Sequence, residues 1–306
     1  MRLALFAATL TLLSAPLVAA APATTADGMV VARIRTGVGA CVAVGAYGSV
    51  WVSNNGSGTV ARVNPRTNRV VRRVLVGPGP CGLAAAAGRI WIDGFGSNSV
   101  ERLHPRRMRI ERRIIVGTQP WDVVAGAGSV WVTNAGSGSV FRIDPRRNRI
   151  TRRIQTGEQP ANMRFRAGTL WVGSNSGTKI FRIDAATNAV TAIDMGHAAP
   201  SSVAVTGDAV WVTSSVDNVA LRLDPSSGAV VATVPVGTRP IEPAVARDGT
   251  VWVPNNRDDT VSRIDPRTNA VSETIPVCAG PVVANAAFGD IWVTCLRGLE
   301  AWRLRP

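Results

Sequence analysis

Few side chains in this sequence could serve as an acid, a base or a metal ligand. The sequence has two histidines, His104 and His197. His104 stands before a proline, where similar segments carry Asp, so we interpret it as a turn residue. His197 could act as a general base beside Glu158 or Glu242. No Ser-His-Asp arrangement, phosphate-binding glycine loop or dense set of metal ligands accompanies it in the sequence.

Seven loops hold the other side chains that could bind a ligand. Each loop contains small residues, often with a proline, and precedes a short apolar segment. The loops differ from one another while their surroundings repeat, and functional residues concentrate in such loops. An aromatic surface with a few converging polar groups is the usual composition of a binding site. The candidate ligand-binding residues are Trp121, Asp122, Glu158, Asn162, His197, Arg239 and Glu242.

The segments that must position these loops repeat along the chain. Seven tryptophans recur at intervals of 40, 40, 40, 40, 41 and 40 residues, and an arginine follows each by eleven positions. A period of about 40 with glycine-punctuated segments is typical of propellers and solenoids. We expect the tryptophans to pack between blades and the arginines to bind turn carboxylates or backbone carbonyls. These residues are Trp51, Trp91, Trp131, Trp171, Trp211, Trp252 and Trp292, and Arg62, Arg102, Arg142, Arg182, Arg222, Arg263 and Arg303.

Each repeat divides into four short strand-like segments. Residues 129–133 and 139–143 are rich in β-branched and aromatic residues, and Asn, Asp, Gly and Pro fill the turns between them. Four segments in each of seven repeats predict an all-β fold, a seven-bladed β-propeller of four-stranded antiparallel blades. The last repeat stops after its third strand, whereas residues 30–37 match the fourth-strand pattern. We therefore expect the N-terminal strand to complete the last blade and close the ring.

Propeller topology would bring the candidate loops together. The loop that enters each blade and the loop between its second and third strands lie on one face, at the mouth of the central channel. We therefore expect the candidate side chains to ring one pocket. Ordinary solvated loops are the alternative, since exposed loops are polar by default. Trp121 argues against that alternative, because an unrepeated tryptophan is not required by the core.

The beginning of the chain indicates export. Residues 1–20 combine Arg2, an apolar run and small residues before Ala21, which is the layout of a secretory signal peptide. A retained membrane anchor is the alternative, although the apolar run is short for a span. We expect a short linker at residues 21–29 and the propeller at residues 30–306. The expected location is periplasmic or secreted, with no transmembrane segment after signal cleavage.

Four cysteines in an exported protein favour disulfides over free thiols. Cys41 and Cys81 occupy the same position in adjacent repeats, and Cys278 and Cys295 flank part of the last repeat. We favour pairing Cys41 with Cys81 and Cys278 with Cys295, although four cysteines allow three pairings. A metal site made by these residues would lack the close cysteine spacing that supports one.

The net charge of +14 is unevenly distributed along the repeats. Arginines cluster in the fourth segments, and the turns before them, of the first three repeats; the fourth strand is outermost in a propeller. We expect a basic rim that binds an anionic envelope polymer, lipid head groups or an acidic protein, and nucleic acid fits an exported protein less well. A solvated arginine-rich face is the alternative. The rim residues are Arg72, Arg73, Arg106, Arg107, Arg109, Arg112, Arg113, Arg146, Arg147, Arg149, Arg152 and Arg153.

Three segments carry a family resemblance: V-W-V-T-N at residues 130–134, R-I-D-P-R-T-N at residues 263–269 and V-G-x-x-P at residues 116–120. They resemble the YVTN-type β-propellers and the related streptogramin-lyase-like (virginiamycin B lyase-like) propellers, over residues 30–306. The resemblance implies the propeller fold. For the lyases it further implies a metal-assisted ring-opening elimination by paired histidines and a glutamate in late blades. No histidine follows His197 in this sequence.

These observations predict an exported, non-catalytic β-propeller that acts as a binding or interaction scaffold, with a ligand pocket at the channel mouth and a basic rim. The alternative is a lyase-like or hydrolase-like enzyme that uses His197 and Glu242 in that pocket. The resemblance also leaves open a role as an accessory subunit of a periplasmic redox complex. We expect a monomer without a cofactor, and the sequence leaves metal binding open.

Overall fold

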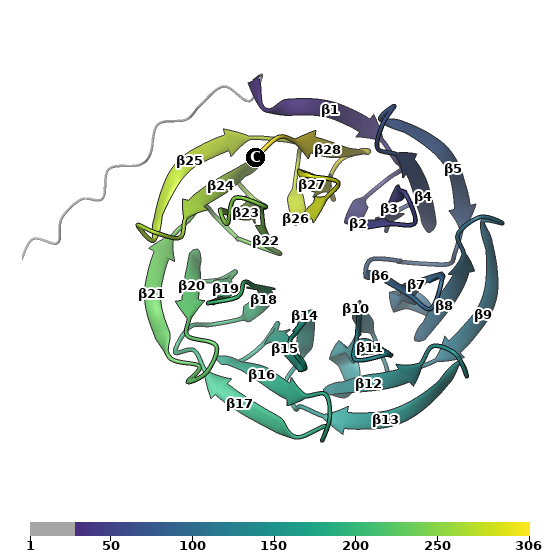
Figure 1. Cartoon of the computed structure of the whole chain (residues 1–306), viewed down its shortest axis with the longest axis horizontal. Helices are drawn as coiled ribbons and strands as arrows, with labels where there is room; N and C mark the ends of the chain where they lie inside the picture. Colours follow the sequence, from purple (N-terminus) through teal and green to yellow (C-terminus); the bar gives the residue numbers. More distant parts are fainter. Residues whose placement is uncertain (1–27) are drawn as a thin grey trace, which may run out of the picture.

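Seven four-stranded antiparallel sheets form a closed ring around a central channel (Figure 1). The computed structural model describes residues 28–306. The signal peptide expected at residues 1–20 lies outside these residues. The all-β class and the seven blades expected from the repeats are confirmed. Within each sheet the strands follow the chain from the channel outward, except that β1 (Val30–Arg35) joins the last blade.

The strand bounds follow the repeats closely. The first three blades comprise β2 (Ala40–Ala46), β3 (Ser49–Asn54), β4 (Thr59–Asn64) and β5 (Arg69–Leu75); β6 (Leu83–Ala86), β7 (Arg89–Gly94), β8 (Ser99–His104) and β9 (Arg109–Ile115); and β10 (Pro120–Gly126), β11 (Ser129–Asn134), β12 (Ser139–Asp144) and β13 (Arg149–Gln155). The next three comprise β14 (Pro160–Arg166), β15 (Thr169–Ser174), β16 (Lys179–Asp184) and β17 (Val190–Asp194); β18 (Pro200–Val205), β19 (Val210–Ser214), β20 (Val219–Leu223) and β21 (Val230–Pro235); and β22 (Ala244–Val245), β23 (Val251–Asn255), β24 (Thr260–Asp265) and β25 (Ala270–Pro276). The last blade contains β26 (Pro281–Ala287), β27 (Asp290–Cys295) and β28 (Glu300–Leu304).

Helical structure is limited to two single 3-10 turns, η2 (Phe95–Ser97) and η3 (Ala135–Ser137), in the part of the chain that the structure describes. They follow β7 and β11, at the loops between the second and third strands of two blades. Within residues 28–306 no helix has the length and apolar character needed to cross a membrane.

Short polar turns connect the third and fourth strands. In the third blade, Asp144 Oδ1 accepts hydrogen bonds from the backbone N–H groups of Arg146 and Arg147 at 2.8 and 3.0 Å. In the second blade, His104 Nδ1 accepts the corresponding hydrogen bonds from the backbone N–H groups of Arg106 and Arg107, both at 3.2 Å. The interpretation of His104 as a turn residue is therefore confirmed.

Buried tryptophans and their arginine partners hold neighbouring blades together. Each of the seven recurrent tryptophans is at most 3% exposed. In the third blade the guanidinium carbon of Arg142 lies 4.7 Å from the ring centroid of Trp131, a cation–π geometry. Arg142 also donates to the carbonyl oxygen of Ala185 in the next blade at 2.7 Å. The structural role expected of these repeated residues is confirmed.

The N-terminal strand closes the ring. β1 pairs antiparallel with β28, with Ile34 opposite Ala301. Arg73 of the first blade donates to the carbonyl oxygens of Arg35 and Thr36 at 2.7 and 2.6 Å, which ties the closing strand to its other neighbour. The expected closure is confirmed, and it pairs a strand edge that would otherwise be open.

Both expected disulfides are present. Cys41 and Cys81 connect the first and second blades, with 5.2 Å between their Cα atoms. Cys278 and Cys295 are joined at the last blade, with 5.8 Å between their Cα atoms. Disulfides of this kind persist in oxidising compartments such as the periplasm and the extracellular space.

Candidate functional site

Loops that enter the blades, and loops between second and third strands, line a cavity of about 220 Å³. Three candidate residues, Trp121, Asn162 and Arg239, line this cavity. Two more candidates, Asp122 and Glu242, belong to the same entry segments and are buried, with 4% and 2% of their surfaces exposed. The structure therefore brings five of the seven candidate positions into one region.

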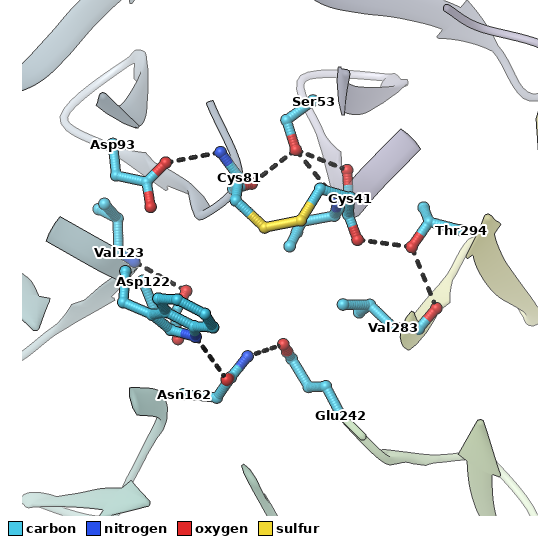
Figure 2. The surroundings of a disulfide bond; sticks show 12 residues. Cys41, Ser53, Cys81, Asp93, Asp122, Val123, Asn162, Glu242, Val283 and Thr294 are labelled. Atoms are coloured by element: carbon cyan, nitrogen blue, oxygen red, sulfur yellow. Dashed lines mark hydrogen bonds between the residues drawn. A yellow bond between two sulfur atoms is a disulfide. The ribbon is translucent and has the colours of Figure 1, made fainter. Parts of the chain in front are cut away.

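Apolar groups form much of the cavity wall. The disulfide between Cys41 and Cys81 lines one side (Figure 2). Phe95 and Trp121 meet edge to face, with ring centroids 6.0 Å apart, and each is 37% exposed. The remaining apolar lining residues are Pro120, Ile241, Val282, Val283 and Leu296. The cavity thus offers open aromatic surface next to a cross-linked, rigid wall.

A local irregularity of the backbone directs Trp121 away from its own blade. The pairing of β10 with β11 shifts between Pro120 and Asp122, so Trp121 has no opposite partner. Such a bulge re-aims one side chain. The preceding Gln119 has φ 51°, and Arg239 has φ 55° at the same place in the sixth blade. Ala199 has the same conformation in the fifth blade, so the left-handed residue before the proline is a feature of several entry loops.

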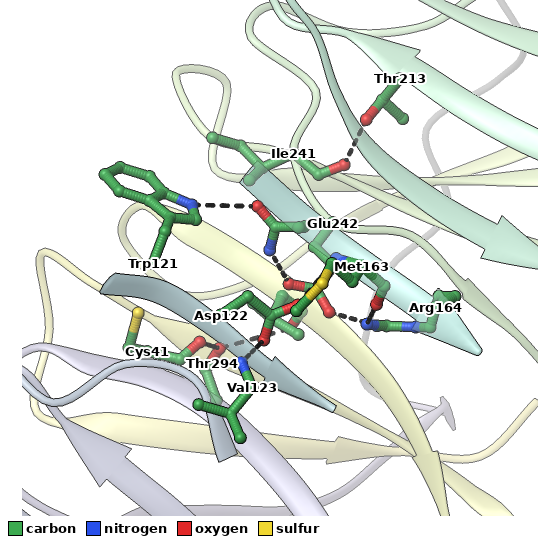
Figure 3. Close-up of polar contacts among 12 residues, drawn as sticks. Cys41, Trp121, Asp122, Val123, Met163, Arg164, Thr213, Ile241, Glu242 and Thr294 are labelled. Atoms are coloured by element: carbon green, nitrogen blue, oxygen red, sulfur yellow. Dashed lines mark hydrogen bonds and ion pairs between the residues drawn. The ribbon is translucent and has the colours of Figure 1, made fainter. Parts of the chain in front are cut away.

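A polar network lies beside the aromatic wall (Figure 3). Trp121 Nε1 donates a hydrogen bond to Asn162 Oδ1 at 3.1 Å. Asn162 Nδ2 donates in turn to Glu242 Oε2, and the guanidinium of Arg164 pairs with Glu242 Oε1. The network joins side chains from three blades, so the orientation of Trp121 depends on the ion pair between the buried Glu242 and the partly exposed Arg164.

Asp122 is a buried acid next to this network. Its Oδ1 accepts from the backbone N–H of Val123 at 2.7 Å, and its Oδ2 accepts from that of Met163 at 2.8 Å. Burial raises the pKa of Asp122 to about 7, the negative charge of Glu242 adds to the rise, and Arg164 opposes it. Asp122 therefore keeps its proton to a higher pH than an ordinary aspartic acid does.

Glu242 reaches the network because the sixth blade begins irregularly. β22 has two residues, and the segment before it pairs with the seventh blade. The Glu242 N–H donates to the carbonyl of Val282, and its carbonyl accepts from the N–H of Ala284, both at 3.0 Å. Pro243 follows and has no N–H with which to continue a ladder. This parallel pairing holds the Glu242 carboxylate on the channel side of the blade.

Asp93 is another buried acid, and it lines the cavity (Figure 2). It is 1% exposed, and its Oδ1 accepts from the backbone N–H of Cys81 at 2.7 Å. Its Oδ2 has no hydrogen-bond partner. Burial raises the pKa of Asp93 well above its ordinary value, the backbone N–H groups of Cys81 and Gly82 oppose the rise, and the charges of Asp122 and Glu101 add to it.

His197 and Glu158 do not line the cavity. His197 Nδ1 lies 2.9 Å from Asp217 Oδ2, in the loop between β19 and β20. The Glu158 carboxylate packs against Gly177 of the same blade. A side chain in place of this glycine would clash with Glu158 Oε1. Among residues 28–306 no group of three or more His, Cys, Asp or Glu side chains could hold a metal ion.

All twelve arginines expected at the rim are exposed, on the outermost strands β5, β9 and β13 or in the turns before β9 and β13. Some also make internal contacts. Arg113 pairs with the buried Glu101 at 2.9 Å, and Arg153 lies 5.4 Å from the ring centroid of Phe141. The turn residue Arg147 pairs with Asp144 at 2.9 Å. The outer wall of the first three blades therefore carries a dense set of exposed guanidinium groups.

The sequence pattern did not point to Arg164, Asp93 or Phe95, because all three lie outside the entry loops. Arg164 lies within β14, opposite Trp171. The residues opposite the other recurrent tryptophans are uncharged: Val44, Ala84, Val124, Ala204, Ala244 and Asn285. Asp93 follows Trp91 by two positions, where the other repeats have Ser, Thr, Gly or Pro. Comparison of the repeats position by position would have singled out both charges.

No family model and no curated protein matches this chain. Solved structures resemble it in fold. A streptogramin B lyase is 17% identical, with a TM-score of 0.77 over 88% of this chain and 94% of that one. Virginiamycin B lyase from Staphylococcus aureus is 18% identical, with a TM-score of 0.77 over 88% and 95%. Hydrazine synthase from Kuenenia stuttgartiensis is 15% identical, with a TM-score of 0.77 over 88% and 96%. At such low identities the similarity establishes the propeller fold alone.

Proposed function

We propose that this chain is an exported, non-catalytic β-propeller that binds a small ligand in the cavity at the channel mouth and an anionic partner at its basic rim. The observation that carries the proposal is the cavity, which combines open aromatic surface with buried polar groups. The network from Trp121 through Asn162 to Glu242 supports the aromatic wall. A wall held rigid before binding loses less entropy when the ligand binds.

The lining favours a ligand of limited size with an apolar body. A volume of about 220 Å³ suits a small molecule rather than a polymer chain. Phe95 and Trp121 would contact a flat ring, and the disulfide and Ile241 would contact its edge. Arg239 also lines the cavity, and its positive charge favours a neutral or anionic ligand over a cation.

A filled-cavity variant tests this proposal. Ile241→Trp places a larger side chain in the lining, whereas Val216→Trp adds the same side chain at an exposed position, 62% accessible. We expect small aromatic fragments, detected by saturation-transfer NMR, to bind wild type and Val216→Trp and to lose binding to Ile241→Trp. Thermal unfolding of the three proteins checks that they are folded. Fragments that bind all three proteins alike, or none of them, would refute the cavity as a binding site.

A lyase-like activity is the second candidate. His197 and Asp217 form a pair of the kind that orients a general base, but neither residue lines the cavity. A catalytically inactive Staphylococcus aureus virginiamycin B lyase has been solved with quinupristin, so quinupristin is the substrate to test. We expect no product by chromatography. A product that disappears in His197→Ala, with the fold intact, would establish the enzymatic function instead.

A further inference from the structure

We propose that Asp93 anchors the ligand of this cavity: its neutral carboxyl group donates a hydrogen bond to an acceptor atom, such as a carbonyl oxygen, on a small ring-containing ligand. The inference deepens the proposed function, since it assigns the ligand class of the same cavity and rests on that cavity being a binding site. It names a residue that is neither in the entry loops nor in the network around Glu242.

The two carboxyl oxygens of Asp93 have different surroundings. Oδ1 accepts the backbone N–H of Cys81 at 2.7 Å, whereas Oδ2 has no partner, although the side chain is 1% exposed and lines the cavity. Buried polar atoms are nearly always hydrogen-bonded, so an unpaired one calls for a specific explanation. A ligand atom in the cavity would supply the missing partner.

Burial favours the neutral form of this carboxyl group, and the neighbouring charges add to that effect. Glu101 on β8 and Asp122 on β10 are the charged groups that act on it, and both are acids that disfavour a second negative charge. The nearby cation Arg113 is already paired with Glu101 at 2.9 Å. Because Oδ1 accepts from Cys81, the proton resides on Oδ2. A neutral carboxyl group then presents one O–H donor to the cavity.

The rest of the lining fits an acceptor on an apolar ring. Trp121 and Phe95 provide aromatic surface beside Asp93, and the Cys41–Cys81 disulfide closes the same side of the cavity. Arg239 lines the cavity and disfavours a cationic group. Together these residues select a neutral or anionic ligand with a carbonyl-type acceptor over an amine.

A purely structural role for Asp93 is the competing explanation, and the other repeats show what it would be. At the same repeat position, Ser53 donates to the carbonyl of Cys81 at 2.5 Å, and Thr213 donates to the carbonyl of Ile241 at 2.7 Å. These bonds join neighbouring blades. Asp93 makes no such bond to the third blade, which leaves its Oδ2 free for the cavity. Asp93→Thr would therefore restore the residue type of the other blades.

Two substitutions and two probes test the anchor. Asp93→Asn keeps an acceptor for Cys81 and an N–H donor at the free position, whereas Asp93→Thr keeps only a shorter hydroxyl. Affinities for acetophenone, a neutral acceptor, and benzylamine, a cation of similar shape, are measured by ligand-observed NMR titration, with thermal unfolding as the check on folding. We expect wild type and Asp93→Asn to bind acetophenone within about twofold of each other and Asp93→Thr to bind it about fivefold or more weakly. We expect benzylamine to bind more weakly than acetophenone to all three.

The outcomes separate the two proposals. Equal binding of acetophenone to wild type and Asp93→Thr would overturn the anchor while leaving the cavity a binding site. Tighter binding of benzylamine that is lost in Asp93→Asn would show an ionised carboxylate and would also overturn it. No binding of either probe to any of the three proteins would remove the cavity proposal and the anchor together.

Discussion

A few charged side chains decide the electrostatics of the candidate site. Arg164 pairs with Glu242, and its positive charge also opposes the rise in the pKa of the neighbouring Asp122. One cation therefore serves two buried acids. Removing one partner of a buried ion pair leaves the other charge without compensation, which destabilises a protein more than the pair stabilises it.

The first expected outcome concerns Arg164→Met. The substitution leaves the Glu242 charge buried without its cation, so we expect the free energy of unfolding to fall by about 3 kcal/mol. Arg166→Met, at the exposed end of the same strand, is the matched control and should change stability by less than about 0.5 kcal/mol. Chemical denaturation measures both. Similar small losses for the two variants would contradict the importance of the pair.

The second expected outcome concerns pH. Asp122 has a pKa of about 7 in the folded protein and about 4 in the unfolded chain, so the folded state binds the proton more tightly. The free energy of unfolding should therefore fall as the pH rises from about 4 to about 7. Glu242→Gln removes the negative charge that helps to raise this pKa. Denaturation curves across that interval should fall less steeply for Glu242→Gln than for wild type; identical slopes would contradict this assignment.

At the scale of the elements, two local features of the backbone shape the candidate site. The bulge in β10 leaves Trp121 without an opposite partner, and Glu242 pairs in parallel with the seventh blade. The strands, the turns and the closure by β1 could be predicted from the sequence, because each depends on a pattern within one repeat. The pairing of Arg164 with Glu242 could not, because it joins two blades across the channel and no local pattern records it.

The third expected outcome concerns the closing strand. Ile34 of β1 is 4% exposed, whereas Ile115 at the end of β9 is 65% exposed. Ile34→Ala should lower the free energy of unfolding by about 2–4 kcal/mol, because it leaves a cavity in the core of the closing blade. Ile115→Ala should change it by less than about 0.5 kcal/mol. A comparison of the two denaturation midpoints checks this, and an unaffected Ile34→Ala protein would argue against closure by this strand.

At the scale of the whole molecule, there are two candidate binding surfaces: a cavity and an arginine-rich outer wall. The cavity is lined by loops from several blades, whereas the exposed arginines lie on the outer strands and adjoining turns of the first three blades. The position of these arginines could be predicted from the sequence, since the fourth strand of a blade is outermost. Their binding partner could not be predicted, because positive charges gathered on one side of a protein attract any anionic surface.

The fourth expected outcome concerns this rim. Replacing Arg106, Arg109 and Arg112 with Gln should weaken retention on a sulfated-polysaccharide column and lower the salt concentration needed for elution. Replacing Arg247, Arg257 and Arg305, which are exposed elsewhere, removes the same charge and is the control. Equal shifts for the two triple variants would show that net charge alone, and not the rim, causes retention.

The most direct test of a binding site at the channel mouth is a crystallographic fragment screen, in which crystals are soaked with small aromatic amides, ketones and acids. We expect density for several fragments to gather in one place, in contact with Trp121, Phe95 and Asp93 and within reach of Arg239. Fragments that bind only elsewhere on the propeller, in crystals that leave this cavity open to solvent, would contradict the proposed function.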